Sequence, residues 1–402
     1  MKKPFLLGGL LAGLVNSSLH TALAADSEIT GQLALQGRLF THDALLPRQH
    51  DGLDLSLAGE LEYYREWRDG DDSLTVKPFF RGDNQDRERS HADIRELYWQ
   101  HVADDWELRI GLNKVFWGVT ESVHLVDIIN QTDLVEDTDG EDKLGQPMIN
   151  LSWIAEQGVL DLFLLPGFRD RTFPGITGRL RTEPYVDTDQ TQYQARNGRG
   201  HFDWAVRWSQ VIGDWDLGLA HFQGTSRDPS LLPGGDGAGT PVLIPYYPLI
   251  RQTSLDAQLT TNDWLWKLEW LSRAGQGSRY TAAAGGFEYT RVGILDTAAD
   301  LGLIGEYLFD DRGASAPTLF QNDLMLGARL TLNDVQSSEL LFGVVQDLDS
   351  PQRLYSLEAS RRLGDDWTLS LESRFNSHLN AADLFGAIRR DDFIQLELTR
   401  YF

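Results

Sequence analysis

The sequence predicts an all-β protein: a closed antiparallel transmembrane β-barrel of about 18 strands, with 16 as the alternative. Three observations predict it. Apolar and polar side chains alternate with a period of two along most of the chain. The last alternating segment, 392–402, ends on the aromatic residue Phe402. Beyond residue 25 no apolar run approaches the ~20 residues that a spanning helix needs, so the chain must cross lipid as a closed sheet without unpaired backbone groups.

The two ends of the chain predict export to the cell outer membrane. Two lysines precede an apolar run over residues 5–15, and residues 22–24 offer a small-x-small cleavage site. We therefore expect residues 1–24 to be a signal peptide and residues 25–402 to form a single outer-membrane β-barrel domain. The C-terminal aromatic strand is typical of such barrels, although Arg400 departs from the pattern. Expected partners are the barrel-assembly machinery, outer-membrane lipid and lipopolysaccharide.

The alternation is clear in segment 52–66, where Leu53, Leu55 and Leu57 share one face. In a barrel such a face contacts lipid and the opposite face lines the lumen, whereas in a soluble sandwich it would be core. The number of segments favours the barrel. The predicted strands are 28–40, 52–66, 73–82, 91–102, 105–116, 148–155, 158–166, 201–212, 214–223, 251–261, 263–273, 279–292, 299–309, 320–332, 337–347, 352–363, 366–377 and 391–402.

The connections alternate between short and long, which is the pattern of periplasmic turns opposite external loops. The short turns are 103–105, 156–158, 213–214, 261–263, 333–334 and 364–366, and the long insertions are 117–147, 167–200, 224–250 and 378–390. With an even number of strands, both termini fall on the periplasmic side. Four short turns are followed by tryptophan, which predicts an aromatic girdle at that interface: Trp106, Trp215, Trp264 and Trp367.

Composition excludes several classes of function. The chain has no cysteine, which excludes disulfide scaffolds and thiolate metal sites. A net charge of −24 argues against nucleic acid as a partner. The sequence has no Gly-x-Ser-x-Gly, no His-Glu-x-x-His and no phosphate-binding loop. We expect neither an enzyme nor a cofactor.

The long insertion 117–147 is the candidate functional segment. It is too apolar to lie free in water, and Val123, Val126 and Ile129 have helical spacing. We expect it to fold into the barrel and narrow the pore. The candidate constriction residues are Trp117, Asp127, Asn130, Asp133, Glu136 and Asp137. The candidate wall residues, taken from the inward phase of the strands, are Arg38, Lys77, Arg81, Arg109, Arg207, Lys267, Arg329, Arg362 and Arg374.

Carboxylates on such a loop, opposite basic groups on the wall, would create a transverse field that orders polar solutes. An alternative for the acidic run 136–142 is a solvated external tip. Residues 137–142 also resemble the opening of a calcium loop, but Met148 stands where the twelfth-position glutamate belongs. We assign no metal site.

Two other long insertions carry weaker indications. Residues 167–200 contain a basic cluster that could attract lipopolysaccharide phosphates or merely balance acidic loops: Arg169, Arg171, Arg179, Arg181, Arg196 and Arg199. Residues 229–248 are rich in proline and glycine, which indicates an ordered loop tip or an aromatic contact for a sugar.

Residues 108–118, which end in Trp117-Gly118, are followed by Asp127-Ile128-Ile129-Asn130. This motif resembles one found in porin-like outer-membrane β-barrel proteins of Gram-negative bacteria, a group of uncharacterised function with polysaccharide-export and phosphate-selective barrels as distant relatives. The chain departs from that motif at residues 113–114 and at Gln131. The resemblance implies a porin-type barrel with the motif loop in its lumen.

The expected function is a channel for passive or facilitated diffusion of small hydrophilic solutes. One alternative is an export conduit for a polysaccharide or lipid-like product, working with a periplasmic partner. Another is a non-conducting scaffold or adhesin. The sequence leaves the solute, the ion selectivity and the oligomeric state open.

Overall fold

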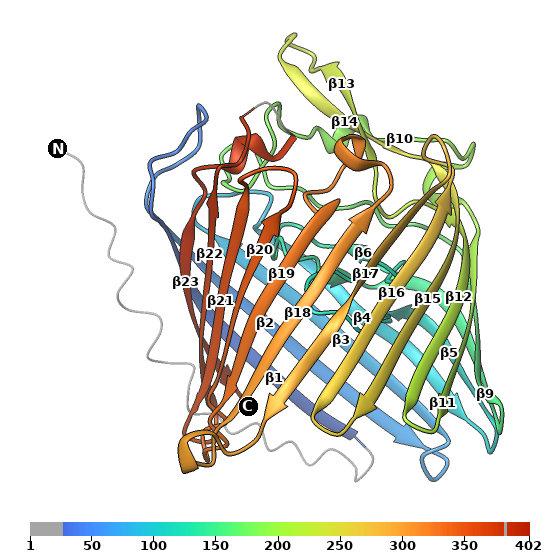
Figure 1. Ribbon diagram of the computed structural model, residues 1–402. Helices are drawn as coiled ribbons and strands as arrows, with labels where there is room; N and C mark the ends of the chain where they lie inside the picture. The colour runs from blue at the N-terminus through green and yellow to red at the C-terminus, as the bar shows by residue number, and fades with distance from the viewer. Residues whose placement is uncertain (1–26, 382–383) are drawn as a thin grey trace, which may run out of the picture.

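A computed structural model describes residues 27–381 and 384–402; the predicted signal peptide lies outside these residues. Eighteen antiparallel strands form one closed barrel (Figure 1), which confirms the predicted fold class. Barrel strands that follow one another in the chain pair with each other. The barrel strands are β1 (Ser27–Phe40), β2 (Leu53–Trp67), β3 (Asp72–Asp83), β4 (His91–Val102), β5 (Trp106–Asn113), β8 (Gln146–Ala155), β9 (Gly158–Leu165), β11 (Asp203–Ile212), β12 (Trp215–Thr225), β15 (Leu249–Thr261), β16 (Trp264–Ala274), β17 (Tyr280–Arg291), β18 (Asp300–Asp310), β19 (Asn322–Thr331), β20 (Glu339–Asp347), β21 (Arg353–Leu363), β22 (Trp367–Ser377) and β23 (Phe393–Tyr401).

The seam of the barrel lies between its first and last strands. β1 pairs with β23 along residues 32–40, and Gly31 and Phe402 exchange two backbone hydrogen bonds of 2.9 and 3.0 Å. A Cβ on Gly31 would lie 2.8 Å from the Phe402 ring. Glycine therefore leaves the space that the terminal aromatic ring fills, and the closed sheet has no free edge.

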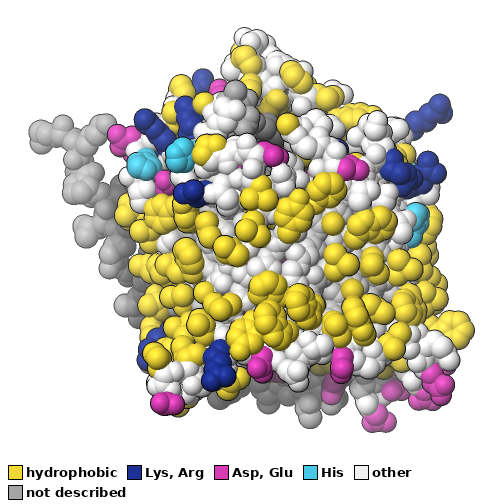
Figure 2. Space-filling view, viewed as in Figure 1, with side chains coloured by type: hydrophobic (Ala, Val, Ile, Leu, Met, Phe, Trp, Pro, Cys, Tyr) yellow, Lys and Arg dark blue, Asp and Glu magenta, His cyan; other side chains and the backbone are white. Residues whose placement is uncertain are grey.

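The face of the barrel seen in Figure 2 carries many apolar side chains between its two rims. On β1, Leu35 and Leu39 are 56% and 47% exposed, whereas Gln36 and Arg38 between them are about 5–6% exposed. The apolar face thus points outward and the polar face inward, as in a barrel that spans the outer membrane. Among the described residues no helix is long and apolar enough to cross a bilayer, a finding that concerns helices alone.

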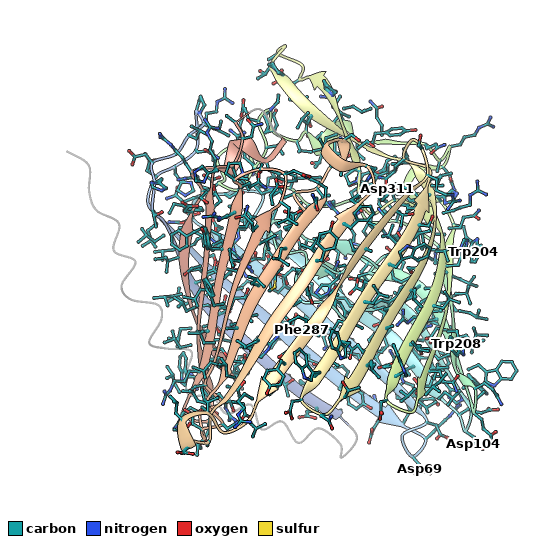
Figure 3. The ribbon with its side chains drawn as sticks, in the orientation of Figure 1. Asp69, Asp104, Trp204, Trp208, Phe287 and Asp311 are labelled. Atoms are coloured by element: carbon teal, nitrogen blue, oxygen red, sulfur yellow. The ribbon has the colours of Figure 1, made fainter. Side chains whose placement is uncertain are left out.

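The two rims of the barrel differ. Figure 3 shows Asp69 and Asp104 at the rim with short turns and Asp311 at the opposite rim, where the long loops lie. Phe287 lies on the lower half of the wall in this view, and its ring is 5.2 Å from that of Trp264. The four tryptophans of the predicted girdle each begin a strand at the short-turn rim, which confirms their common level: Trp106, Trp215, Trp264 and Trp367.

The long-loop rim carries additional structure. Residues 229–248, predicted as a loop tip, form instead a hairpin that projects from the rim in Figure 1. Its strands are β13 (Ser230–Gly235) and β14 (Pro241–Tyr247), and the short β10 (Gln192–Tyr193) pairs with β14. The 3₁₀ turns are η1 (Thr188–Gln190), η2 (Gly198–Gly200), η3 (Ile294–Asp296), η4 (Gly313–Ser315) and η5 (Leu384–Ile388).

Candidate functional site

The third loop, residues 114–145, connects β5 to β8 and lies inside the barrel, as predicted. It contains the small hairpin of β6 (Gln131–Thr132) and β7 (Lys143–Leu144), and Figure 1 shows β6 within the outline of the barrel, below the rim. The predicted strand 105–116 ends earlier, at Asn113. The Val115 N–H turns away from the wall and donates to Asn130 Oδ1 at 2.8 Å.

Two buried carboxylates of the wall hold the first part of the third loop. Glu269 on β16 accepts three backbone N–H bonds of 2.7–3.1 Å from segment 119–126. Glu306 on β18 accepts two more, of 2.8 and 2.9 Å, from residues 121–122. Hydrogen bonds to a charged acceptor are worth about 1.5–3 kcal/mol each. These two side chains therefore determine where the loop crosses the lumen.

The helical spacing of Val123, Val126 and Ile129 does not correspond to a helix in the structure. Residues 114–130 contain no helix. In a helix, backbone N–H groups donate to carbonyls four residues earlier, but here the wall carboxylates accept them. The spacing reflects burial against the wall instead.

The apolar part of the third loop packs on one side of the lumen. Trp117, Val126, Ile128 and Ile129 are at most 4% exposed. On β9, Leu162 and Leu164 face lipid at 42% exposure each. The inner face of the wall under the loop is apolar too, so β9 is apolar on both its lipid face and its lumen face. The buried wall residues of this cluster are Met148, Phe163, Leu165, Ala205, Ala220, Phe222 and Ile250.

Two residues predicted for the constriction, Asp127 and Asn130, bind the third loop to itself. Asn130 Nδ2 donates to the carbonyls of Asn113 and Leu144, both at 2.9 Å, which ties the two ends of the loop together. Asp127 is 3.0 Å from Lys143 Nζ. Burial raises the pKa of Asp127 above its ordinary value, although Lys143 opposes the shift. Neither side chain faces open lumen.

The acidic tip of the third loop is fastened to strands β1–β4 by a group that we call the arginine latch. Its ion pairs are Arg95–Asp133 at 2.6 Å, Arg81–Glu136 at 2.8 Å and Arg38–Asp137 at 3.4 Å. Arg89, from the loop between β3 and β4, donates to the Val135 carbonyl at 2.8 Å. The paired side chains are at most 12% exposed. The predicted residues Asp133, Glu136, Asp137, Arg38 and Arg81 thus meet in this latch.

Arg95 is part of the latch although the strand alternation gave no reason to select it. The register between β3 and β4 shifts at Lys77 and Pro78, so that Arg95 has no partner residue on β3. At this bulge both Arg95 and its neighbour Glu96 are buried, at 5% and 9% exposure. Proline within a strand is confined to edges and bulges, and Pro78 was therefore the available sequence signal.

One group of potential metal ligands is found among the described residues: His91, Asp133 and Glu136. Two of its carboxylates already pair with Arg95 and Arg81. Those guanidinium groups supply the positive charge that a cation would bring. The acidic run 137–142 uses side-chain oxygens to accept backbone N–H groups of its own turn.

The other side of the third loop is less covered, and we call it the open side. Here Glu121 pairs with Arg329 at 2.7 Å, and Asp139 lies 3.6 Å from Arg374. Glu141 is 67% exposed and lies 3.6 Å from His124. The wall members of the open side lie on β16, β17, β19, β21 and β22: Lys267, Glu288, Arg329, Glu358, Glu372 and Arg374.

His124 links the two limbs of the third loop on this side. Its ring lies between Glu141, at 3.6 Å, and Glu269, at 4.0 Å. Burial disfavours the imidazolium, but the interactions with the two glutamates outweigh burial and raise the pKa of His124 to about 9. His124 is therefore positively charged at neutral pH.

The remaining predicted wall groups do not form ion pairs with the third loop. Arg207 pairs with Asp256 and also lies over the Trp117 ring at 5.1 Å. Arg362 lies near the short-turn rim and is exposed, and within the described chain it forms no side-chain ion pair. The other two pair with strand carboxylates: Lys77 with Glu62 and Glu96, and Arg109 with Glu107.

The basic cluster of residues 167–200 is mostly neutralised within the protein. Five of its six arginines pair with carboxylates: Arg169 with Asp93, Arg171 with Asp228, Arg179 with Asp391, Arg181 with Glu183 and Arg199 with Asp170. These pairs hold the external loops over the barrel. They leave few free cations for lipopolysaccharide phosphates.

Comparisons by sequence identify no relatives: no family model matches the chain, and no curated protein matches it. Comparisons by structure identify several solved proteins with a similar fold. OccK11 (OpdR) of Pseudomonas aeruginosa has a TM-score of 0.55 at 10% identity, over 94% of this chain and 96% of that one. OccD3 (OpdP) of the same species has a TM-score of 0.52 at 10% identity, over 95% and 92%.

A third similar structure is Wzi of Escherichia coli, an outer-membrane protein involved in group 1 capsule assembly and described as a carbohydrate-binding β-barrel. Its TM-score is 0.55 at 8% identity, over 94% of this chain and 84% of that one. At such low identities the likeness concerns the fold. The chain is therefore an 18-stranded β-barrel of the cell outer membrane with a porin-like fold.

Proposed function

We propose that this protein is an outer-membrane channel for the diffusion of small hydrophilic solutes, and that the third loop is its constriction. One observation carries the proposal. The loop is fastened inside the lumen at its acidic tip by the arginine latch and along its first part by Glu269 and Glu306, while its open side keeps charged side chains exposed.

The fastening holds the tip of the loop against one wall of the barrel. Removing one partner of a buried ion pair costs about 3–5 kcal/mol, and the latch contains three such pairs. A loop held this way narrows the pore to a fixed size. Solutes are then selected by size at the open side rather than by opening of a gate.

The charges of the open side give the constriction an electrostatic character. Glu121 and Glu141 lie on the loop, and Arg329 and Arg374 lie on the facing wall. Facing groups of opposite sign orient polar molecules and penalise apolar ones. OccK11 and OccD3 are outer-membrane porins, and the shared fold supports the same general role here.

The likeness to Wzi favours a second candidate: a barrel that binds carbohydrate at the cell surface and does not conduct. In this chain, the β13–β14 hairpin and the arginine-rich loop would form the external binding surface. Tyr193 lies there, with its ring stacked on that of the buried Tyr247 at a centroid distance of 5.6 Å.

Single-channel recording on the purified full chain in planar bilayers separates the two candidates. The channel predicts current steps of uniform size, which grow when the latch variant Glu136→Ala releases the loop tip. The Arg362→Ala variant, at the short-turn rim, is the matched control and should leave the step size unchanged. Absence of current steps in both wild type and latch variant, together with glycan binding by intact cells, would establish the second candidate instead.

A further inference from the structure

A cavity of about 290 Å³ opens on the lumen side of the third loop. It is lined by both limbs of the loop: Phe116, Thr120, Glu121, His124 and Glu141. Its position on the open side places it where solutes would pass. Its lining combines one aromatic ring with two carboxylates.

Phe116 is the unusual member of this lining. Its neighbour Trp117 is 4% exposed and packs on the wall, whereas Phe116 is 55% exposed. Its ring makes a T-shaped contact with that of His124, with the ring centroids 4.7 Å apart. An exposed ring inside a polar lumen contributes little to packing, but its face can attract a positively charged group.

The two carboxylates approach the cavity from different limbs of the loop. Glu121 pairs with Arg329 of β19 at 2.7 Å and lies 3.8 Å from Lys267. Among the described residues, the carboxylate of Glu141 pairs only with His124, and two thirds of the side chain stay exposed. A solute with an ammonium group can therefore reach Glu141 without displacing a wall arginine.

The balance of charge around the cavity is negative. The latch arginines Arg38, Arg81 and Arg95 already form ion pairs with carboxylates of the loop tip. The basic groups that remain on the open side are His124, Lys267, Arg329 and Arg374. They face a larger set of carboxylates: Glu121, Asp139, Glu141, Glu288, Glu358 and Glu372.

We infer that this cavity binds small organic cations that carry an apolar face, such as alkyl- and arylammonium compounds, as they pass the constriction. The inference rests on the proposed channel and names its substrate class. The ammonium group pairs with Glu141 and Glu121, and the apolar part lies on the Phe116 ring. Anions of the same size meet the same carboxylates and are repelled.

The probes are phenethylammonium and, as an anion of similar size, 3-phenylpropionate. In planar bilayers, phenethylammonium should interrupt the current at millimolar concentration and 3-phenylpropionate should not. Phe116→Leu keeps an apolar side chain without the ring and should raise the blocking concentration about three-fold. Glu141→Gln should also raise the blocking concentration about three-fold, because it removes the exposed charge. Glu156→Gln, in an exposed periplasmic turn, removes one charge elsewhere and should change nothing.

Calorimetric titration of the detergent-solubilised full chain with phenethylammonium measures the same site without current. Saturable binding that weakens in Phe116→Leu and Glu141→Gln supports the cation site in the cavity. This holds even if the barrel passes no current, a result that would refute the proposed channel but not the cation site. Equal block by both probes, or a conducting barrel that neither binds phenethylammonium nor is blocked by it, would overturn the cation site and leave the channel intact.

Discussion

The two sides of the third loop carry the same kinds of side chain and use them differently. On the arginine latch, guanidinium and carboxylate groups lie 2.6–3.4 Å apart and are almost completely buried. On the open side, Glu141 and Glu358 are 67% and 45% exposed. Burial, rather than residue type, thus distinguishes charges that anchor the loop from charges that a solute can meet.

Breaking the latch should have the largest effect. Glu136→Ala leaves Arg81 buried without its partner, which costs about 3–5 kcal/mol. We expect a lower thermal midpoint in detergent and noisier, larger current steps. Glu358→Ala, on the open side, is the matched control. Equal midpoints and equal noise in the two variants would remove the distinction between the two sides.

Weakening the wall carboxylates should have the next largest effect. Glu269→Gln keeps the shape but removes the charge that accepts three backbone N–H groups, at about 1.5–3 kcal/mol for a charge-assisted bond. Hydrogen–deuterium exchange should accelerate in segment 119–126 and stay slow at the latch residues 133–137. Unchanged exchange in segment 119–126 would show that the apolar packing alone holds this part of the loop.

The two limbs of the loop should separate at alkaline pH. The pKa of His124 is raised to about 9 from an ordinary value of 6.5. The stabilisation from its pairs with Glu141 and Glu269 is therefore complete below about pH 6.5 and is lost as pH rises through about 9. Burial, with Glu136 and Asp139 next in effect, raises the pKa of Asp142 to about 7, so measurements between pH 8 and pH 10 separate the titration of His124 from that of Asp142. Current noise should increase over this window in wild type. A His124→Asn variant should show no such increase.

Changes confined to the open side should affect stability least. Glu358→Gln removes a half-exposed charge next to Arg374 and should cost less than about 1 kcal/mol. Its effect should appear in the reversal potential under a salt gradient, as a reduced preference for cations. A reversal potential equal to that of wild type would place the passage elsewhere in the lumen.

The strands could be predicted from sequence because their signal is local. Each residue of a lipid-facing strand shows its environment directly, as Leu35 and Gln36 do on β1. The eighteen predicted strands are confirmed, with ends that differ by a few residues. The apolar content of segment 117–129 was enough to place the third loop inside the barrel.

The conformation of the third loop could not be predicted because its partners are distant in sequence. Glu269 is 150 residues from Val119, and Glu306 is 185 residues from Glu121. The spacing of the apolar residues therefore indicated a helix that these carboxylates prevent. Arg95 was missed for a different reason, because the bulge turns two successive side chains, Arg95 and Glu96, to the buried side, which a strict alternation does not predict.

The central claim is that solutes pass along the open side while the latch side stays closed, and the absence of cysteine from the chain allows a direct test. Glu141→Cys and Val135→Cys are recorded in planar bilayers during addition of a charged, thiol-reactive methanethiosulfonate reagent. We predict a stepwise fall in current for Glu141→Cys and no change for Val135→Cys, whose side chain is 5% exposed on the latch side and takes no part in its ion pairs. A fall for Val135→Cys, with none for Glu141→Cys, would contradict the account.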